Sequence, residues 1–388
     1  MDLSKIFQEN ISQYLQLYGR NIPFNHLKAI NAIINCRTSA MGGEVYFCEE
    51  CKTYHYSYHS CQNRHCPKCQ SSQSSEWLER QLQKLLPVKY HLVGFTIPPE
   101  LHKVFRSNQK LCYSLLFKSA AEALQVLLAD PKYAGGIGGI IGVLHTWTRT
   151  LLYHPHVHFI VPGGAFDALR REWRDSQHAF LIPVLALSIL YRAKLRDNLK
   201  TSNPKLFYSI PQQVWKREFV THSKPAGKGE KALKYLSNYV YRIAITNNRI
   251  VRCENGMVTF QYKESKTNKI KFQTVSALEF MRRFLQHVLP TGFQKVRYYG
   301  FMSSAAKELF KDVKQVLGTP KQKAGSKATS SKQSERAANV CPDCSKIMKL
   351  VTICYRKKRA PPFSWCIEKN VLSTVWQRSL AQKQNLIA

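Results

Sequence analysis

The stretch His154-Pro155-His156-Val157-His158-Phe159-Ile160-Val161 decides how this chain is expected to fold. Its β-branched and aromatic residues predict a β-strand over 155–162. Because side chains alternate between the two faces of a strand, His154, His156 and His158 share one face. These histidines could bind one metal ion, or they could form a polar face toward solvent. Three histidines within five residues, directly before an apolar strand end, favour the metal.

A second strand is predicted just before this one, over residues 140–150. A short turn joins the two segments, so we expect them to pair as an antiparallel hairpin. His145 would then face the middle of the hairpin, within reach of the same metal ion. A metal ion bound by two or three neutral imidazoles keeps positions open for water and substrate oxygens, as a Lewis-acid site requires.

The rest of the chain reads as a mixture of helices and strands. Helices are predicted over 1–40, 70–86, 100–128, 181–199, from about 230 and over 277–289, and strands over 88–97, 243–252 and 257–263. Asn255-Gly256 indicates a hairpin between the last two strands. The basic segment 224–229 is expected to be a flexible loop, and residues 319–339, almost free of apolar side chains, a linker.

The charge of the chain is strongly unbalanced. Its 388 residues include 58 Lys and Arg against 24 Asp and Glu, which gives a net charge of +34. This excess indicates a polyanionic partner, most commonly nucleic acid, although a merely soluble basic protein is the alternative. The few carboxylates form no cluster that resembles a two-metal nuclease site. No apolar run could span a bilayer and no secretory signal is visible, so we expect a soluble intracellular protein without a membrane partner.

Twelve cysteines without a secretory signal indicate metal binding rather than disulfides. Cys48-x2-Cys51 and Cys66-x2-Cys69 are two CxxC pairs with 14 residues between them. Each pair can bind one edge of a tetrahedral Zn²⁺ ion, and four thiolates would close the coordination sphere. We therefore predict one structural zinc site, which stabilises a small N-terminal domain.

Several other side chains could take part in zinc binding. Near the CxxC pairs these are Cys36, Cys61, His55, His59 and His65. They could replace a ligand, form a second site or belong to the core. The tail carries a further pair, Cys341-x2-Cys344, but no later pair at the same spacing, so a zinc ion there is the weaker expectation.

Residues 231–242 predict a helix with two neighbouring tyrosines. At about 100° per residue, Tyr235 and Tyr239 lie together beside the apolar stripe, on a flank shared with Lys231 and Arg242. Two phenols beside basic residues suit nucleophiles that attack a phosphodiester. The alternative is that both tyrosines simply pack at the edge of a core. We favour the nucleophile interpretation only because the histidine motif needs a nucleophile.

These motifs together resemble a known family. His156-Val157-His158 is similar to the His-hydrophobic-His motif of the HUH single-strand endonucleases, and Tyr235-x3-Tyr239 to the paired tyrosines of their two-tyrosine branch. The specific resemblance is to transposases of the insertion-sequence-91 type. It covers about residues 25–305 and includes the stretches 36–38, 60–69, 144–147 and 283–290.

The resemblance implies an α+β fold with an antiparallel-sheet HUH core flanked by helices. In order along the chain it implies a helical, zinc-binding head over 1–86, the core over 87–305, a basic low-complexity linker over 306–340 and a tail with a CxxC pair over 341–388. It also implies a cytoplasmic prokaryotic protein associated with the nucleoid, whose partner is single-stranded DNA at transposon ends and target.

The chemistry implied by the resemblance is rolling-circle transposition. His156, His158 and a third ligand would bind Mg²⁺ or Mn²⁺ against the scissile phosphate. One tyrosine would form a 5′-phosphotyrosine and release a 3′-OH, and the other could perform the second transfer. The expected third ligand is His145, with His154 and Glu279 as alternatives. The residues expected to contact DNA are Lys231, Arg242, Arg64 and Lys68.

Two other functions are compatible with the same motifs. A relaxase or replication initiator would use the same chemistry for another outcome. A non-catalytic zinc protein that binds nucleic acid would need neither the histidine pair nor the tyrosines, and their presence argues against it.

Overall fold

The structure, a computed structural model, describes residues 1–69, 79–82, 84–176, 180–228, 243–264, 267–318 and 340–355. Contacts divide the chain into two compact units, each built from separate segments. Unit 1 comprises residues 1–70, 243–288 and 322–388, and unit 2 comprises residues 71–242 and 289–321. The expected order of head, core, linker and tail therefore differs from the observed division, because segments far apart in the sequence share a unit.

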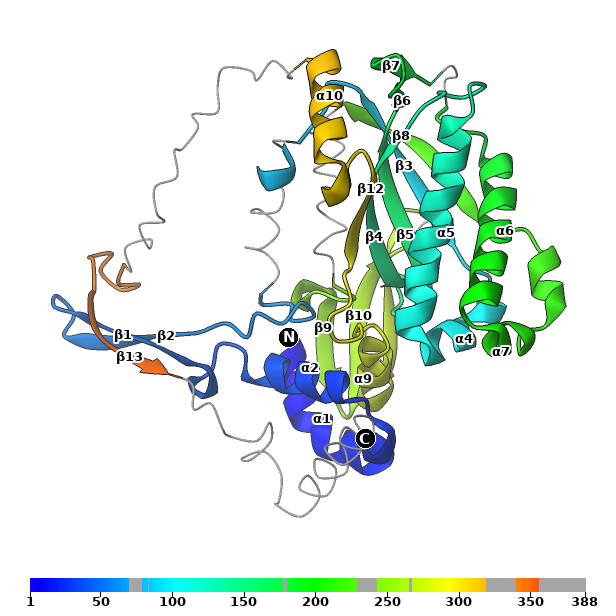
Figure 1. Ribbon diagram of the computed structural model, residues 1–388. Coiled ribbons are helices and arrows are strands. Elements are labelled where there is room, and N and C mark those ends of the chain that lie inside the picture. Colours follow the sequence, from blue (N-terminus) through cyan, green and yellow to red (C-terminus); the bar gives the residue numbers. More distant parts are fainter. Residues whose placement is uncertain are drawn as a thin grey trace, which may run out of the picture. The chain divides into compact units, whose positions relative to one another are not determined.

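Unit 2 is built on a five-stranded antiparallel sheet with the strand order β12-β4-β5-β3-β8 (Figure 1). Its strands are β3 (Lys89–Thr96), β4 (Gly139–Trp147), β5 (Tyr153–Pro162), β8 (Thr221–Lys228) and β12 (Val296–Gly300). The predicted hairpin is confirmed, since β4 and β5 are paired antiparallel with Leu144 opposite Val157. The apolar side chains of these two strands fit their central position in the sheet.

Helices cover one face of this sheet. They are α4 (His102–Ser107), α5 (Gln109–Ala129), α6 (Val184–Ser202) and α7 (Pro204–Tyr208). The odd-numbered side chains of β5, such as Val157 and Phe159, pack with α5 and α6 in one buried core. The predicted helix over 100–128 is interrupted at Asn108, whose side chain donates a hydrogen bond to the Val104 carbonyl.

The opposite face is covered at one end by α10 (Lys307–Leu317), and a small hairpin of β6 (Gly164–Asp167) and β7 (Glu172–Asp175) completes the unit. Phe310 and Val313 of α10 pack against apolar residues of the sheet such as Ile141 and Ile160. The expected linker over 306–340 is thus wrong for residues 307–317. Their basic composition conceals apolar side chains at helical spacing.

The expected flexible loop at 224–229 is also wrong for its described part. Residues 221–228 form β8, which pairs with β3. A proline is tolerated because β8 is an edge strand, and Pro225 lies opposite His91 next to an irregularity in the register.

Unit 1 contains two three-stranded sheets. One has the order β11-β10-β9, from β9 (Ile250–Glu254), β10 (Met257–Lys263) and β11 (Ile270–Ser276), and is followed by α9 (Ala277–Leu285). Helices α1 (Leu3–Tyr18) and α2 (Phe24–Asn35) confirm the helical character of residues 1–40, and Phe7 packs edge-on against Phe284. The Asn255-Gly256 hairpin is confirmed, with both residues at positive φ as a tight turn requires.

The other sheet of unit 1 joins the two ends of the sequence. Its order is β13-β1-β2, from β1 (Gly42–Cys48), β2 (Thr53–Tyr58) and β13 (Lys349–Tyr355). β13 pairs antiparallel with β1, from Gly42 opposite Tyr355 to Phe47 opposite Lys349. The segment expected to be a separate tail is therefore part of unit 1.

Candidate functional site

The candidate site lies on the face of the unit 2 sheet opposite to α5 and α6. Across this face the register aligns one residue from each strand: Val296, Val143, His158, Gly94 and His222. The next row contains His145 directly opposite His156. Since directly paired residues of neighbouring strands project to the same side, the histidines of three strands share one face.

Three of these histidines form a compact cluster. Each of His145, His156 and His158 offers a ring nitrogen, and these nitrogens all lie within 4.8 Å of one another. His145 is 2% exposed and His158 is 9% exposed, whereas His156 is half-buried. The arrangement can hold one cation from the protein side and leave its remaining positions open.

Contacts around the cluster orient its rings. The Nδ1–H group of His156 donates a hydrogen bond of 2.7 Å to the carbonyl oxygen of His154, because that oxygen can only accept. His156 Nε2 is then the nitrogen with a lone pair for a metal, an arrangement typical of histidine ligands. The ring of His145 stacks on Trp147 with 4.8 Å between centroids, and Lys295 Nζ lies 5.3 Å from the Trp147 ring centroid.

The alternative third ligands are placed differently. The His154 ring lies between those of His156 and His102, with centroid distances of 5.2 and 5.7 Å, and it is not a member of the compact cluster. Both carboxylate oxygens of Glu279 accept hydrogen bonds from arginines of its own helix, Arg282 and Arg283. These bonds lower the pKa of Glu279 to about 2.

A fourth histidine, His222, belongs to the same face and was not predicted. Its ring centroid lies 6.1 Å from that of His158. A Cβ atom at Gly94, the residue between them in the row, would lie 1.9 Å from Cε1 of His222, so this approach requires a glycine. Partial burial and the neighbouring Lys224 ammonium lower the pKa of His222. Its isolated position in a Lys- and Pro-rich segment gave no signal in the sequence.

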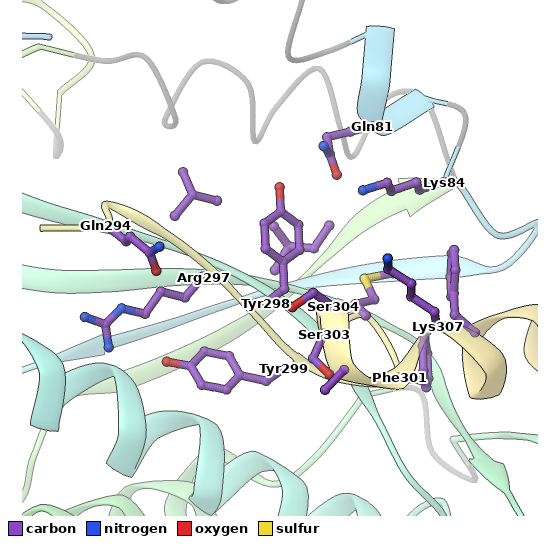
Figure 2. Close-up of a pocket in the computed structure, with 15 residues that line it drawn as sticks. Gln81, Lys84, Gln294, Arg297, Tyr298, Tyr299, Phe301, Ser303, Ser304 and Lys307 are labelled. Atoms are coloured by element: carbon purple, nitrogen blue, oxygen red, sulfur yellow. The ribbon is translucent and has the colours of Figure 1, made fainter. Parts of the chain in front are cut away.

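A groove of about 860 Å³ begins on the same face, along β12 and the start of α10. Figure 2 shows the Tyr298 ring directed toward Gln81 and Lys84, while Lys307 and Ser304 border the groove nearby. Lys84 Nζ lies 5.7 Å from the centroid of the Tyr298 ring. An aromatic ring with lysines nearby suits a stacked base and the phosphates of its strand.

The cysteines of unit 1 form two clusters of four. Cys36, Cys61, Cys66 and Cys69 form the head cluster, and Cys48, Cys51, Cys341 and Cys344 form the ribbon cluster. In each cluster all four sulfur atoms lie within 4.8 Å of one another. The prediction of one site with Cys48, Cys51, Cys66 and Cys69 is therefore wrong.

The reason for this correction is local geometry. Cys48 and Cys51 lie in the turn between β1 and β2, and the tail cysteines reach this turn because β13 pairs with β1. Cys36, which follows α2, and Cys61 complete the other pair, with sulfur distances of 3.4 and 3.6 Å to Cys69. Spacing alone could not assign ligands to two sites, because six cysteines lie within 34 residues of the head.

The residues expected to contact DNA fall into two groups. Lys68 Nζ forms an ion pair of 2.5 Å with the Asp2 carboxylate, which neutralises its charge locally, and Arg64 is half-buried. The expected nucleophiles Tyr235 and Tyr239, and the basic residues Lys231 and Arg242, lie outside the described residues.

Known proteins are similar to this chain over most of its length. A family model described as “Transposase zinc-binding domain” matches residues 6–97, and one described as “Putative transposase” matches residues 139–309. The protein “Putative transposase y4qJ” of Sinorhizobium fredii is 35% identical over 364 residues, which cover 87% of this chain and 92% of that protein. This chain belongs to the insertion-sequence-91-like transposase family.

A second relative of this transposase is the transposase for insertion sequence element IS801 of Pseudomonas savastanoi pv. phaseolicola. The two are 28% identical over 295 residues, which cover 72% of this chain and 70% of the relative. No solved structure matches the chain.

Family membership establishes the general activity. The insertion-sequence-91-like transposase is an enzyme of the nuclease and transferase class, and its substrate is DNA. The matched zinc-binding domain contains the complete head cluster, so this unit carries structural zinc.

One helix of the transposase is long and apolar enough to cross a membrane. Among the described residues this is α5, and 61% of its apolar stretch is buried inside the protein. Such burial is typical of the core helix of a soluble protein, which agrees with the cytoplasmic location expected of a transposase.

Proposed function

We propose that this transposase cuts and rejoins single-stranded DNA through 5′-phosphotyrosine intermediates, as in rolling-circle transposition. The convergence of His145, His156 and His158 on one sheet face is the observation that carries the proposal. It offers a cation site with open positions beside a groove suited to nucleic acid.

The donor set fits a divalent cation such as Mn²⁺ or Mg²⁺. The three imidazoles would hold it, with His156 Nε2 made available by the hydrogen bond from His156 Nδ1 to the His154 carbonyl. When bound, the cation would stabilise the negative charge that develops on the scissile phosphate and on the departing 3′ oxygen. Burial of His145 and His158 keeps their rings fixed for this task.

The nucleophile in this proposal is the phenolic oxygen of Tyr235 or Tyr239. It loses its proton and bonds to phosphorus, the bond from phosphorus to the 3′ oxygen breaks, and that oxygen takes up a proton. The products are a 5′-phosphotyrosine and a free 3′-OH. The ester keeps the energy of the broken phosphodiester, so the second tyrosine can complete a transfer without a nucleotide cofactor.

Single-stranded DNA suits the groove better than a duplex does. Stacking on Tyr298 requires an unstacked base, and every base offers a π-face to such a ring. Lys84 and Lys307 line the same groove and can contact phosphates of a strand bound there. Trp147, which stacks on His145, is a second aromatic ring beside the histidine cluster.

The experiment incubates the full chain with Mn²⁺ or Mg²⁺ and labelled oligonucleotides that cover the element ends, followed by a denaturing gel. We expect a covalent protein–DNA adduct that depends on the added cation. Tyr235→Phe and Tyr239→Phe should each impair strand transfer, whereas Tyr241→Phe, the matched control, should not.

Two results would contradict the proposal. One is an adduct that persists in the Tyr235→Phe/Tyr239→Phe double variant. The other is the absence of any adduct with end-derived strands of either polarity when the zinc content and the thermal transition of the protein are normal.

A further inference from the structure

We propose that the ribbon cluster, Cys48, Cys51, Cys341 and Cys344, binds a second structural zinc ion that fixes the C-terminal segment 340–355 to the β1–β2 hairpin. The family model for the zinc-binding domain ends at residue 97, so half of these ligands lie outside it. The inference is independent of the tyrosine chemistry proposed above.

The sulfur separations fit a tetrahedral zinc site. The Sγ atoms of Cys48 and Cys344 are 3.5 Å apart, and those of Cys51 and Cys341 are 3.9 Å apart. With zinc–sulfur bonds of about 2.3 Å, the edge of a regular tetrahedron is about 3.8 Å. All four cysteines are free thiols, and their separations are those of ligands around one ion.

The two CxxC turns also have matching backbones. In each, the residue directly after the second cysteine adopts a left-handed conformation, with φ of 54° at Lys52 and 59° at Ser345. Each turn closes a short antiparallel pair: Cys48 lies opposite Thr53, and Val340 forms a bridge with Ile347. Two hairpin turns that face each other with four thiols form a zinc ribbon, here assembled from segments about 290 residues apart.

The surrounding sheet has little else to hold it together. Six of the seven residues of β13 and five of the six residues of β2 are exposed. Apolar side chains of β13 remain accessible, with Val351 at 52% and Tyr355 at 81% exposure. A three-stranded sheet with so small a core depends on another source of stability, and metal coordination supplies it in small domains.

His55 completes the surroundings of the site without replacing a ligand. Its Nε2 lies 3.5 Å from Cys341 Sγ and 3.8 Å from an oxygen of Asp343. A histidine beside a bound thiolate can donate a hydrogen bond to it, which is a usual role for the neighbours of zinc ligands.

The first test measures zinc by mass spectrometry in the full-length protein purified without chelators. We expect about two zinc ions per chain, one for each four-cysteine cluster. The Cys341→Ser/Cys344→Ser variant should lose one ion and keep the other. Cys354→Ser is the matched control, because Cys354 is exposed and belongs to neither cluster, and it should keep both.

The second test measures which thiols react with an alkylating reagent in the intact chain. Cys341 and Cys344 should be protected until a chelator is added, whereas Cys354 should react throughout. Cys48→Ser should expose the two distant tail thiols to the reagent, and Cys66→Ser, which removes a head ligand, should leave them protected.

Three results would overturn the inference. They are a wild-type content of one zinc ion per chain, an unchanged content in the Cys341→Ser/Cys344→Ser variant, and continued protection of Cys341 and Cys344 in Cys48→Ser. Loss of this ion should release only the small β13-β1-β2 sheet, so the helical circular dichroism signal of the tail variant should stay unchanged, which checks that the rest of the chain is folded.

Discussion

At the residue scale, the register of the β4–β5 hairpin favours His145 as the third ligand of the proposed cation. His145 lies directly opposite His156, so the two side chains are nearest neighbours on one face. His154 is on the same strand as His156, but it supports the cluster through its carbonyl oxygen, which accepts a hydrogen bond from His156 Nδ1, and its ring is not a member of the cluster. Alternation along one strand could predict the shared face, whereas the choice between His145 and His154 required the register.

A pair of substitutions tests this choice. His145→Ala removes a ring nitrogen from the cluster and should raise the Mn²⁺ concentration needed for half-maximal adduct formation by at least about 10- to 100-fold, because even partners of metal ligands contribute that much. His154→Ala keeps the carbonyl acceptor and should have a much smaller effect. Titration of adduct yield against Mn²⁺ measures the requirement of each variant. A larger increase for His154→Ala than for His145→Ala would make His154 the ligand.

Gly94 offers a second test at this scale. In Gly94→Ala the new methyl group would overlap the His222 ring, which must turn away from His158 because it is the exposed, movable partner. Displacing a side chain next to the proposed cation site should lower the rate of adduct formation by up to about 100-fold. His222→Ala and the double variant Gly94→Ala/His222→Ala should then have the same rate. If the double variant is much slower than His222→Ala, Gly94 acts through something other than this ring.

At the element scale, prediction succeeded where a local pattern is decisive and failed where neighbours decide. Alternation in 155–162 and the Asn255-Gly256 turn determine two hairpins without help from elsewhere. The segment 224–228 has loop-like residues and becomes a strand because β3 offers it hydrogen bonds. Helix α10 lies within the segment expected to be a basic linker. Its apolar side chains become significant only through their packing against the sheet.

Glu279 tests the stability of one such element. It lies in the first turn of α9, and Arg282 and Arg283 keep it ionised, with a pKa of about 2 against an ordinary value of 4.5. Glu279→Gln should lower the stability of unit 1 by about 1–2 kcal/mol at pH 7, since the side chain is partly exposed and screened. Thermal unfolding should show a decrease of a few degrees, whereas Glu308→Gln, in an exposed pair on α10, should show none.

The pH dependence of this effect has a definite sign. The folded protein favours the ionised form of Glu279, so the contribution is complete above about pH 4.5 and is lost as the pH falls toward about 2. The difference in unfolding temperature between the wild type and Glu279→Gln should therefore narrow over this interval. A difference that widens on acidification would show that the carboxylate is not stabilised in the folded state.

At the scale of the whole molecule, the chain builds each unit from segments that are distant in sequence. The ribbon cluster combines one CxxC pair from each end of the chain, and spacing rules that consider neighbouring pairs cannot find it. Family resemblance predicted the α+β fold and the zinc-binding head because it compares the order of motifs. The four ligands of each cluster depend on the pairing of β13 with β1, which no local pattern of the tail encodes.

The excess of positive charge leads to a prediction for DNA binding by the full chain. Each lysine that neutralises a phosphate of a single strand releases counterions, so the logarithm of the affinity falls with the logarithm of the salt concentration by about 0.7 per contact. Lys84→Ala and Lys307→Ala should each reduce this slope by about 0.7. Lys311→Ala should not reduce the slope, because Glu308 already binds its ammonium.

Tyr298→Ala should instead weaken binding by about 1–3 kcal/mol at every salt concentration, as expected for the loss of a stacked base. Fluorescence anisotropy with a labelled oligonucleotide across a salt series measures both effects. Equal slopes for Lys84→Ala, Lys307→Ala and Lys311→Ala would place the strand outside the groove along β12.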